Sequence, residues 1–263
     1  MRLALAQHYG LHNVVIWLQP DAVPPVLQDS RQDDNDTHVN GGSKFTLAIG
    51  GNCTTGFAWG TASDNYMIAA GHCAPTNSPP DRFPSIGVPH GTSWTDGPGS
   101  ITPPGKTGKF GDIARIILYK KHTASIFIGG PNSTSKRGVA GRWSRTSQKG
   151  DRYCTGGITT GQLCNWVVSA VSETLEMHHN GRKIGVLSPA TVGKRDGTCT
   201  RGGDSGGPVY TIRPDGFITG KGITSGGRNM DQSSWFVSCA NYFTDLERVA
   251  TLWGGDIKKR RVN

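Results

Sequence analysis

"CTRGGDSGGPVY", residues 199–210, places one serine, Ser205, between two pairs of glycines. Glycine weakens helices and strands, so this density predicts a backbone that turns sharply. A serine hydroxyl is a poor nucleophile at neutral pH, and it needs a base to take its proton and donors to hold the oxyanion that forms. Backbone donors do not reorganise, and a sharp turn aims those of Gly203 and Ser205 at one point. We expect Gly206 and Gly207 to leave room for a substrate against the backbone.

His72 is the candidate base for this serine. It ends the apolar run "YMIAAGHC" (66–73), and a disulfide from Cys73 to Cys53 would fix the turn that presents the imidazole. Taken alone, such a histidine is more often structural than catalytic, and a lone "DSG" is an ordinary glycine-rich turn. The two patterns together favour a catalytic pair. The other histidines lie in polar or undefined surroundings: His8, His12, His38, His90, His122, His178 and His179.

Asp112 is the candidate acid that orients the imidazole and sets its tautomer. It stands at the start of the apolar run "GDIARIILY" (111–119), where a carboxylate can be buried against a histidine. Asp81 and Asp96, by contrast, lie in loops rich in Pro and Gly and are expected to be solvated. The sequence therefore predicts a triad in the chain order His72, Asp112, Ser205.

The composition predicts an all-β protein. The chain has 263 residues, of which 38 are Gly and 15 are Pro, and short apolar runs alternate with turn residues. This pattern is typical of a sandwich or a barrel, and no run approaches the roughly 20 apolar residues of a membrane-spanning helix. A single helix is predicted over 244–254, where Thr244 and Glu247 form a capping box. Its apolar face consists of Leu246, Val249, Ala250 and Trp253.

Charge is distributed unevenly along the chain. Residues 1–40 carry two arginines and five aspartates, a net charge of −3 that leaves +12 for the rest of a chain of net charge +9. A basic body is compatible with nucleic acid or an anionic surface, but the basic residues are not interleaved with aromatic ones, so we favour a role in solubility. The stretch 18–43 is polar and rich in Pro, which predicts a linker. We place a boundary near Gly41.

Six cysteines leave two alternatives open. They are either reduced thiols in the core of an intracellular protein or three disulfides, and the even count favours disulfides and an oxidising compartment. No CxxC occurs, so zinc spacing is absent, and no residue is assigned as a metal ligand. The six positions are Cys53, Cys73, Cys154, Cys164, Cys199 and Cys239.

The stretches "AAGHC", "GDIARI" and "CTRGGDSGGPVY", in this order, resemble the chymotrypsin-like serine proteases. "CTTGFAWG", "GDRYCTGGITTGQLC" and "GITSGG" narrow the resemblance to the bacterial streptogrisin-type branch, and it extends from about residue 41 to 254. The resemblance implies two six-stranded antiparallel β-barrels, at about 43–125 and 136–243, followed by the C-terminal helix. It places the active site in the cleft between the barrels.

The resemblance also assigns roles outside the triad. It implies that Ser225, Gly226 and Gly227 form the edge that binds substrate as an added strand. It implies a disulfide hairpin from Cys154 to Cys164, and Cys199 is then left with Cys239. Two extra residues separate Cys199 from Gly203 by comparison with animal members, so the positions of the specificity pocket are not transferred. Thr224 stands where glutamate-specific relatives carry His, and we favour apolar residues before the cleaved bond over basic ones bound through Asp196.

The function that the resemblance implies is that of a secreted, monomeric serine endopeptidase without a cofactor. Residues 1–40 are then the remnant of a pro-region with its linker, residues 41–263 are the protease, and the pro-segment is a partner of its own enzyme. No nucleic acid or membrane is an expected partner. The alternative is a non-catalytic binding protein on the same fold. An internal cation is expected to pair with Asp204, and of Arg142 and Arg152 the resemblance favours Arg142.

Overall fold

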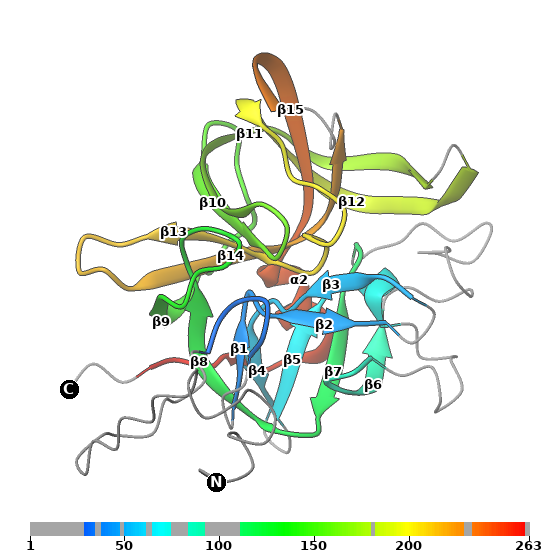
Figure 1. Cartoon of the computed structure of the whole chain (residues 1–263). Helices are drawn as coiled ribbons and strands as arrows, with labels where there is room; N and C mark the ends of the chain where they lie inside the picture. Colours follow the sequence, from blue (N-terminus) through cyan, green and yellow to red (C-terminus); the bar gives the residue numbers. More distant parts are fainter. Residues whose placement is uncertain are drawn as a thin grey trace, which may run out of the picture.

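The computed structural model describes most of the chain, but little of the N-terminal segment 1–40. The described residues are 29–34, 38–47, 50–61, 65–74, 84–92, 111–179, 182–228 and 233–260. Most of them form strands, and one short helix lies near the C-terminus (Figure 1). The prediction of an all-β fold with a C-terminal helix is confirmed. No helix among the described residues is long and apolar enough to cross a membrane.

The N-terminal half of the chain supplies two small sheets. One has five strands in the order β16-β4-β5-β7-β6, and the other pairs β2 with β3. Their bounds are β2 (Lys44–Thr46), β3 (Asn52–Thr54), β4 (Ala58–Gly60), β5 (Asn65–Ala69), β6 (Gly87–Thr92), β7 (Ala114–Leu118) and the late strand β16 (Asp256–Ile257). The apolar runs that predicted strands at 65–73 and 111–119 thus become β5 and β7. β5 is largely buried, whereas in β7 Ala114 and Ile116 are buried and Ile117 is exposed.

A nine-stranded sheet holds most of the C-terminal half. Its order is β1-β8-β9-β14-β13-β10-β11-β12-β15, and β14 also pairs with β15. The bounds are β1 (His38–Gly41), β8 (Lys121–Phe127), β9 (Lys136–Arg142), β10 (Arg152–Gly157), β11 (Gly161–His179), β12 (Arg182–Thr198), β13 (Pro208–Ile212), β14 (Ile218–Arg228) and β15 (Ser233–Asp245). Figure 1 shows β10–β15 as one group of strands above a second group formed by β1–β8. The closure of these groups into two six-stranded barrels stays a prediction.

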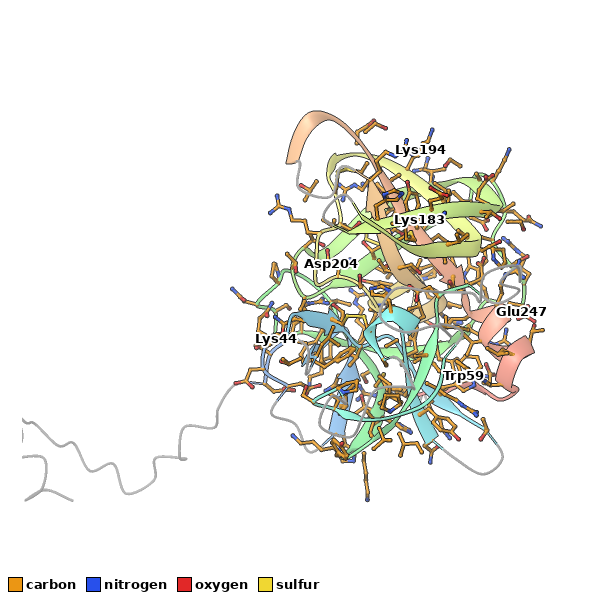
Figure 2. All side chains as sticks on the ribbon, turned by 90° about the vertical axis from the view of Figure 1, so that its right-hand side faces the viewer. Lys44, Trp59, Lys183, Lys194, Asp204 and Glu247 are labelled. Carbon is orange, nitrogen blue, oxygen red and sulfur yellow. A yellow bond between two sulfur atoms is a disulfide. The ribbon has the colours of Figure 1, made fainter. Side chains whose placement is uncertain are left out.

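The buried apolar side chains form two main clusters. The larger cluster packs Phe57, Trp59 and Ile68 against the C-terminal helix, and all three side chains are fully buried. In the second cluster the ring of Tyr153 stacks on Trp166, with 6.1 Å between ring centroids. The larger cluster also includes Cys154, Tyr210, Ile218 and Ile223 from the C-terminal strands, so it extends across the place where the two groups of strands meet. Figure 2 shows Asp204 at this height.

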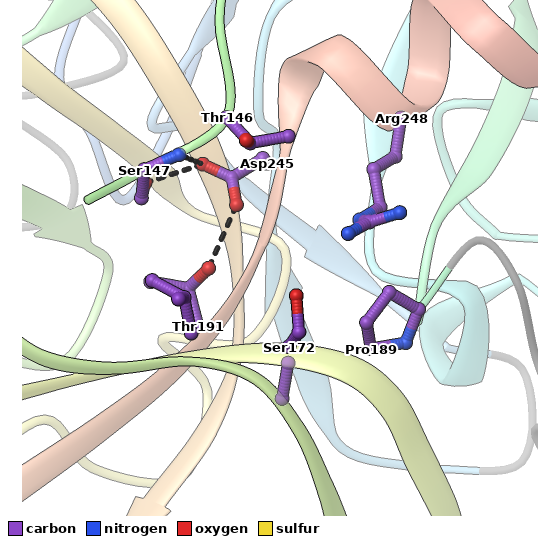
Figure 3. A pocket seen from close by; sticks show the side chains of 9 residues that line it. Thr146, Ser147, Ser172, Pro189, Thr191, Asp245 and Arg248 are labelled. Carbon is purple, nitrogen blue, oxygen red and sulfur yellow. Dashed lines mark hydrogen bonds between the residues drawn. The ribbon is translucent and has the colours of Figure 1, made fainter. Parts of the chain in front are cut away.

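The helix α2 (Leu246–Trp253) confirms the predicted segment, but the predicted capping box is wrong. Asp245 is the residue at the N-cap, and its side chain makes no capping bond. Its carboxylate instead accepts hydrogen bonds from Ser147 and from Thr191, the latter at 2.7 Å, beside a small pocket (Figure 3). Glu247 forms an ion pair with Arg142. Tertiary partners therefore take both carboxylates at this end of the helix.

Three disulfides join the six cysteines in the pairs expected from the sequence. Cys53 bonds to Cys73, Cys154 to Cys164 and Cys199 to Cys239, and each S–S distance lies between 1.95 and 1.97 Å. The first ties β3 to the turn after β5, the second crosses the β10–β11 hairpin, and the third ties β15 to the segment before the Ser205 loop. Two of the three therefore lie beside residues with proposed roles in chemistry.

Candidate active site

His72 lies on a short turn that follows directly after β5. The strand ends at Ala69, and a single turn of 3₁₀ helix, η1 (Gly71–Cys73), carries the histidine. The bond from Cys73 to Cys53 holds this turn against β3. About a quarter of the His72 side chain is exposed (24 %), so the imidazole is anchored and still reachable from solvent.

Sheet register brings Asp112 to His72. β5 and β7 are antiparallel neighbours, and Ala69 lies opposite Ala114. The C-terminal end of β5 and the N-terminal end of β7 therefore lie side by side, and the residues after Ala69 and before Ala114 leave the sheet together. Asp112 is only 1 % exposed there, and its two oxygens accept from His72: Oδ2 from Nδ1 at 2.7 Å and Oδ1 from the backbone N–H at 2.9 Å.

This double contact fixes the state of the imidazole. An ionised carboxylate only accepts hydrogen bonds, so Nδ1 carries the proton in the neutral ring and Nε2 is left as the acceptor. Burial lowers the pKa of His72, but the charge of Asp112 and its hydrogen bond outweigh burial, so the pKa is raised above the ordinary 6.5. The arrangement is that of a histidine base with a positioned acid.

Thr244 is a contributor to this site that the sequence reasoning assigned to a helix cap. Its hydroxyl is fully buried and accepts a hydrogen bond from the backbone N–H of Asp112 at 3.0 Å. A Cβ at Gly111 would lie 2.3 Å from the Thr244 Oγ1, so only glycine fits beside it. The threonine and the preceding glycine together set where the Asp112 backbone lies.

We predict that Thr244→Val lowers kcat about 10-fold with little change in KM, because the Asp112 backbone loses its acceptor and the carboxylate shifts. The buried N–H left without a partner should also cost about 1–3 kcal/mol of stability. Steady-state kinetics and thermal unfolding measure the two effects. Thr251→Val, on an exposed position of the same helix, is the matched control. A Thr244→Val protein with the parent's kcat would show that this hydrogen bond does not position Asp112.

The Ser205 loop lies against the segments that carry His72. The Ser205 carbonyl accepts from the Thr54 N–H at 2.8 Å, and Thr54 directly follows Cys53. Gly206 has a φ of +85°, and a Cβ there would lie 2.2 Å from the Thr54 carbonyl and 3.2 Å from the Ala70 nitrogen. The backbones of the Ser205 loop, β3 and the end of β5 therefore meet closely, which brings Ser205 close to the turn that carries His72.

Gly206 and Gly207 make room for the protein's own backbone, so the expectation that they clear space for substrate is wrong. A Cβ at Gly207 would lie 2.2 Å from the Gly156 carbonyl, and Gly206 is closed in by Thr54. The physical reason is that the loop turns inside a packed interior. The Ser205 hydroxyl itself is partly exposed, and it points to the carbonyl of Ser225 at 3.5 Å.

Some backbone N–H groups of this loop donate to carbonyls and others do not. Those of Asp204, Gly206 and Gly207 donate to backbone carbonyls at 2.8–3.0 Å. In the described part of the chain, the N–H groups of Gly203 and Ser205 donate to none. Gly203 has a φ of +94°, which side chains rarely adopt. Two unused donors on either side of an anchored residue are what an oxyanion site requires.

Asp204 is the anchored residue between these donors. Its carboxylate accepts from the N–H groups of Thr159 (2.8 Å), Thr160 (3.1 Å) and Arg201 (2.8 Å), and from the Thr160 hydroxyl (2.7 Å). Burial raises the pKa of Asp204, and these hydrogen bonds lower it in part.

The predicted ion pair between Asp204 and Arg142 is wrong. Arg142 instead contacts Glu247 and, through Nε at 2.9 Å, Asp256. These two acids flank Arg142 from the C-terminal end of the chain and take its donors. Within the described residues Asp204 forms no ion pair with a contact of 4 Å or less. Neutral donors satisfy it instead.

The proposed substrate edge lies on β14. Residues up to Ile223 pair with β13, whereas Gly226 and Gly227 lie beyond that register and pair only with β15. Ser225 lies directly before them, where the register with β15 shifts. One side of the strand is therefore unpaired here within the described residues. An unpaired edge accepts an extended peptide as an added strand. The Met177 methyl lies 2.9 Å from the point where a Cβ at Gly226 would be, so a side chain at position 226 would have to displace Met177.

Metal-ligand chemistry is not favoured at the histidine. The ligand atoms of Cys53, His72 and Cys73 lie within 4.8 Å of one another. The two sulfurs are bonded to each other, however, and a disulfide does not supply the thiolates that bind metals. The cluster is accounted for by the disulfide that holds the His72 turn.

Comparison with known proteins defines the class of fold. No protein-family model matches the chain, and no curated protein matches it either. Solved structures do match. Thermobifida fusca Protease A is 21 % identical at a TM-score of 0.60, over 85 % of this chain and 100 % of that one. Nocardiopsis protease is 23 % identical at a TM-score of 0.59, over 84 % of this chain and 100 % of that one.

A third structure of this kind is an alpha-lytic protease homologue, N4, which is 20 % identical at a TM-score of 0.55 over 83 % of this chain and 98 % of that one. The structural neighbours are thus bacterial chymotrypsin-like serine proteases, as the sequence motifs indicated. At these identities the likeness establishes the fold.

Proposed function

We propose that this protein is a serine endopeptidase. Ser205 attacks the carbonyl carbon of a peptide bond and forms an acyl-enzyme, while His72 takes the hydroxyl proton and passes it to the leaving amine. Asp112 holds the imidazole in its productive tautomer and stabilises the imidazolium. The N–H groups of Gly203 and Ser205 hold the oxyanion. Water then releases the acyl group by the reverse sequence of proton transfers.

The observation that carries the proposal is the double hydrogen bond between His72 and the buried Asp112. A surface histidine in a structural role has no need of a carboxylate that also binds its backbone N–H. The N–H groups of Gly203 and Ser205, which donate to no backbone carbonyl in the described part of the chain, add donors for the oxyanion next to the nucleophile. Together they supply the base, the acid that orients it, the nucleophile and the oxyanion donors.

The same proposal covers the compartment, the substrate-binding strand, the pro-segment and the oligomeric state. Three disulfides persist in oxidising compartments, so we place the protein outside the cell. The extended substrate binds along Ser225–Gly227 as an added strand. The acidic segment 1–40 carries a net charge opposite to that of the remaining chain, which supports its role as a pro-segment bound by its own enzyme. We propose that the enzyme is a monomer that needs no cofactor.

A library of unstructured peptides tests the proposal. We expect cleavage inside the peptides, with a preference for apolar residues before the cleaved bond. Mass spectrometry of the fragments gives both the position and the preference. A library left intact by the full-length folded protein, and by the same preparation after removal of an N-terminal segment, would contradict endopeptidase activity.

We predict that kcat/KM rises with pH through a midpoint above 6.5. His72 acts as base only when neutral, and Asp112 raises its pKa, so protonated and inactive enzyme persists to a higher pH than a free histidine would give. Stability should move in the opposite direction: the raised pKa stabilises the fold below the unfolded-state value and that stabilisation is lost as pH rises through the folded-state value. A peptide substrate without titrating groups serves for the measurement between about pH 5 and 9. An activity maximum near pH 4 would contradict a histidine base.

A further inference from the structure

The segment Asp29–Asp34 belongs to the region that the sequence assigns to a pro-segment, yet the structure packs it into the protein. Arg31 is 0 % exposed. Its Nη1 donates to the Gly42 carbonyl at 3.2 Å, and its Nη2 donates to the carbonyls of Phe127 at 2.9 Å and Gly129 at 3.5 Å. A buried guanidinium is costly unless it is well paired, so a removable linker would not be expected to carry one.

The residues on either side of Arg31 are bound as well. Gln32 donates from Nε2 to the carbonyls of Pro131, at 3.1 Å, and of Ile158. Asp29 forms an ion pair with Lys136 on β9. The segment is therefore attached at several points, and one of these, Ile158, begins the loop that follows β10.

That loop, 158–160, is held at both ends by this segment and its neighbours. At one end Gln32 contacts Ile158. At the other end Gln162 donates from its backbone N–H to the Gly129 carbonyl at 2.7 Å and accepts from the Gly129 N–H through Oε1 at 3.0 Å. Gly129 is one of the carbonyl partners of Arg31. Gln32 thus contacts one end of the loop directly, and Arg31 contacts the Gly129 carbonyl to which Gln162, just past the other end, is bound.

The middle of the loop binds the segment Gly203–Ser205, which carries the proposed oxyanion donors and is called the oxyanion segment. Thr159 and Thr160 supply three of the four hydrogen bonds to the Asp204 carboxylate. Asp204 in turn separates Gly203 from Ser205, whose N–H groups are the proposed oxyanion donors. A displacement of the loop would therefore shift Asp204 and with it both donors.

Arg31 and Asp204 also lie over consecutive residues of β10. A Cβ at Gly156 would be 3.5 Å from the Arg31 Nη1, and a Cβ at Gly157 would be 2.1 Å from the Asp204 Oδ1. Two glycines in a row leave the space that the two charged groups occupy. Burial lowers the pKa of Arg31 to about 10, and the oxygens of Tyr210 and Asp204 act in the opposite direction.

We propose that Asp29–Asp34 is a permanent part of the working enzyme, in which Arg31 and Gln32 are positioning residues for the oxyanion segment. They act through the 158–160 loop and Asp204, without contacting substrate. This inference rests on the proposed peptidase function. It departs from the mature start near Gly41 that the sequence predicts, because a protein that begins there lacks both residues, and it limits the proposed pro-segment to the residues before Asp29.

The experiment compares three variants of the full chain with the parent: Arg31→Met, Arg31→Lys and Gln32→Glu. Asp33→Asn, an exposed neighbour, is the matched control. Active sites are titrated first, so that kcat refers to folded enzyme. We expect Arg31→Met and Gln32→Glu to lower kcat about 10- to 100-fold with KM unchanged, since a small misplacement of a catalytic group has effects of this size. Arg31→Lys keeps the charge and should recover part of the loss, and the control should match the parent.

Three outcomes would overturn the inference. One is a normal kcat per titrated site in Gln32→Glu and in both Arg31 variants, even if their unfolding temperatures fall. Another is a loss of kcat in Asp33→Asn equal to that in Gln32→Glu. The third is a fully active species, identified by intact mass, that begins after Gln32. If Arg31→Met does not accumulate as folded protein, Gln32→Glu and Arg31→Lys decide. An inactive parent chain would instead count against the peptidase function itself.

Discussion

Ser205→Ala is expected to lower kcat about 10⁶-fold while the protein stays folded. The hydroxyl is the nucleophile, and an alanine at this position leaves only the oxyanion donors and substrate binding to assist attack by water. The neighbouring hydrogen bonds of the Thr54 N–H and of the Asp204 carboxylate do not use the Ser205 side chain, so the loop should keep its shape. Hydrolysis of a chromogenic peptide, with circular dichroism as a check on the fold, measures the effect.

His72→Ala should cost about as much as Ser205→Ala, and the double variant little more, because the nucleophile and its base act as one unit. Ser135→Ala removes an exposed serine of the segment between β8 and β9 and serves as the matched control. A Ser205→Ala protein that keeps more than about one per cent of the parent's kcat would show that Ser205 is not the nucleophile.

Asp112→Asn is expected to lower kcat at neutral pH about 10⁴-fold. The carboxylate accepts two hydrogen bonds from His72, one from Nδ1 and one from the backbone N–H. An amide has a single oxygen, and its NH₂ group facing Nδ1 favours the tautomer in which Nδ1 accepts and Nε2 carries the proton. An imidazole in that tautomer cannot take the Ser205 proton.

The change to Asn at position 112 keeps the size of the side chain, so KM and the unfolding temperature should move far less than kcat. Asp215→Asn, at an exposed aspartate that pairs with Arg213, is the control for loss of one carboxylate. A loss of kcat below tenfold in Asp112→Asn would remove Asp112 from the triad and leave its contact with His72 as a structural one.

Local patterns made part of this structure predictable. β5 and β7 are short apolar runs, and turn residues directly follow the first and precede the second, so the sequence places His72 and Asp112 at strand ends. The glycines around Ser205 likewise indicate a sharp turn whatever surrounds it. The register that joins the strand ends was not predicted, because pairing between β5 and β7 depends on contacts about 45 residues apart in the chain.

Contacts between segments that are far apart in the chain could not be predicted from the sequence. Thr244 fits the pattern of a helix cap, and its bond to Asp112 spans 132 residues. Arg31 sits in an acidic, Pro-rich stretch that reads as a linker, and nothing near it in the chain indicates the carbonyls of Phe127 and Gly129. The partners of Asp204 were misjudged because a buried carboxylate is satisfied equally well by neutral N–H groups as by a cation.

The central claim is that Ser205 is a nucleophile activated by His72, and covalent labelling tests it most directly. A peptidyl organophosphonate reacts with an activated serine and leaves a stable adduct whose position tandem mass spectrometry identifies. The account predicts one adduct per chain, on Ser205, which is absent in Ser205→Ala and forms at least a hundredfold more slowly in His72→Ala. A folded protein that remains unlabelled, or an adduct on another residue, would contradict it and favour a non-catalytic binding protein on this fold.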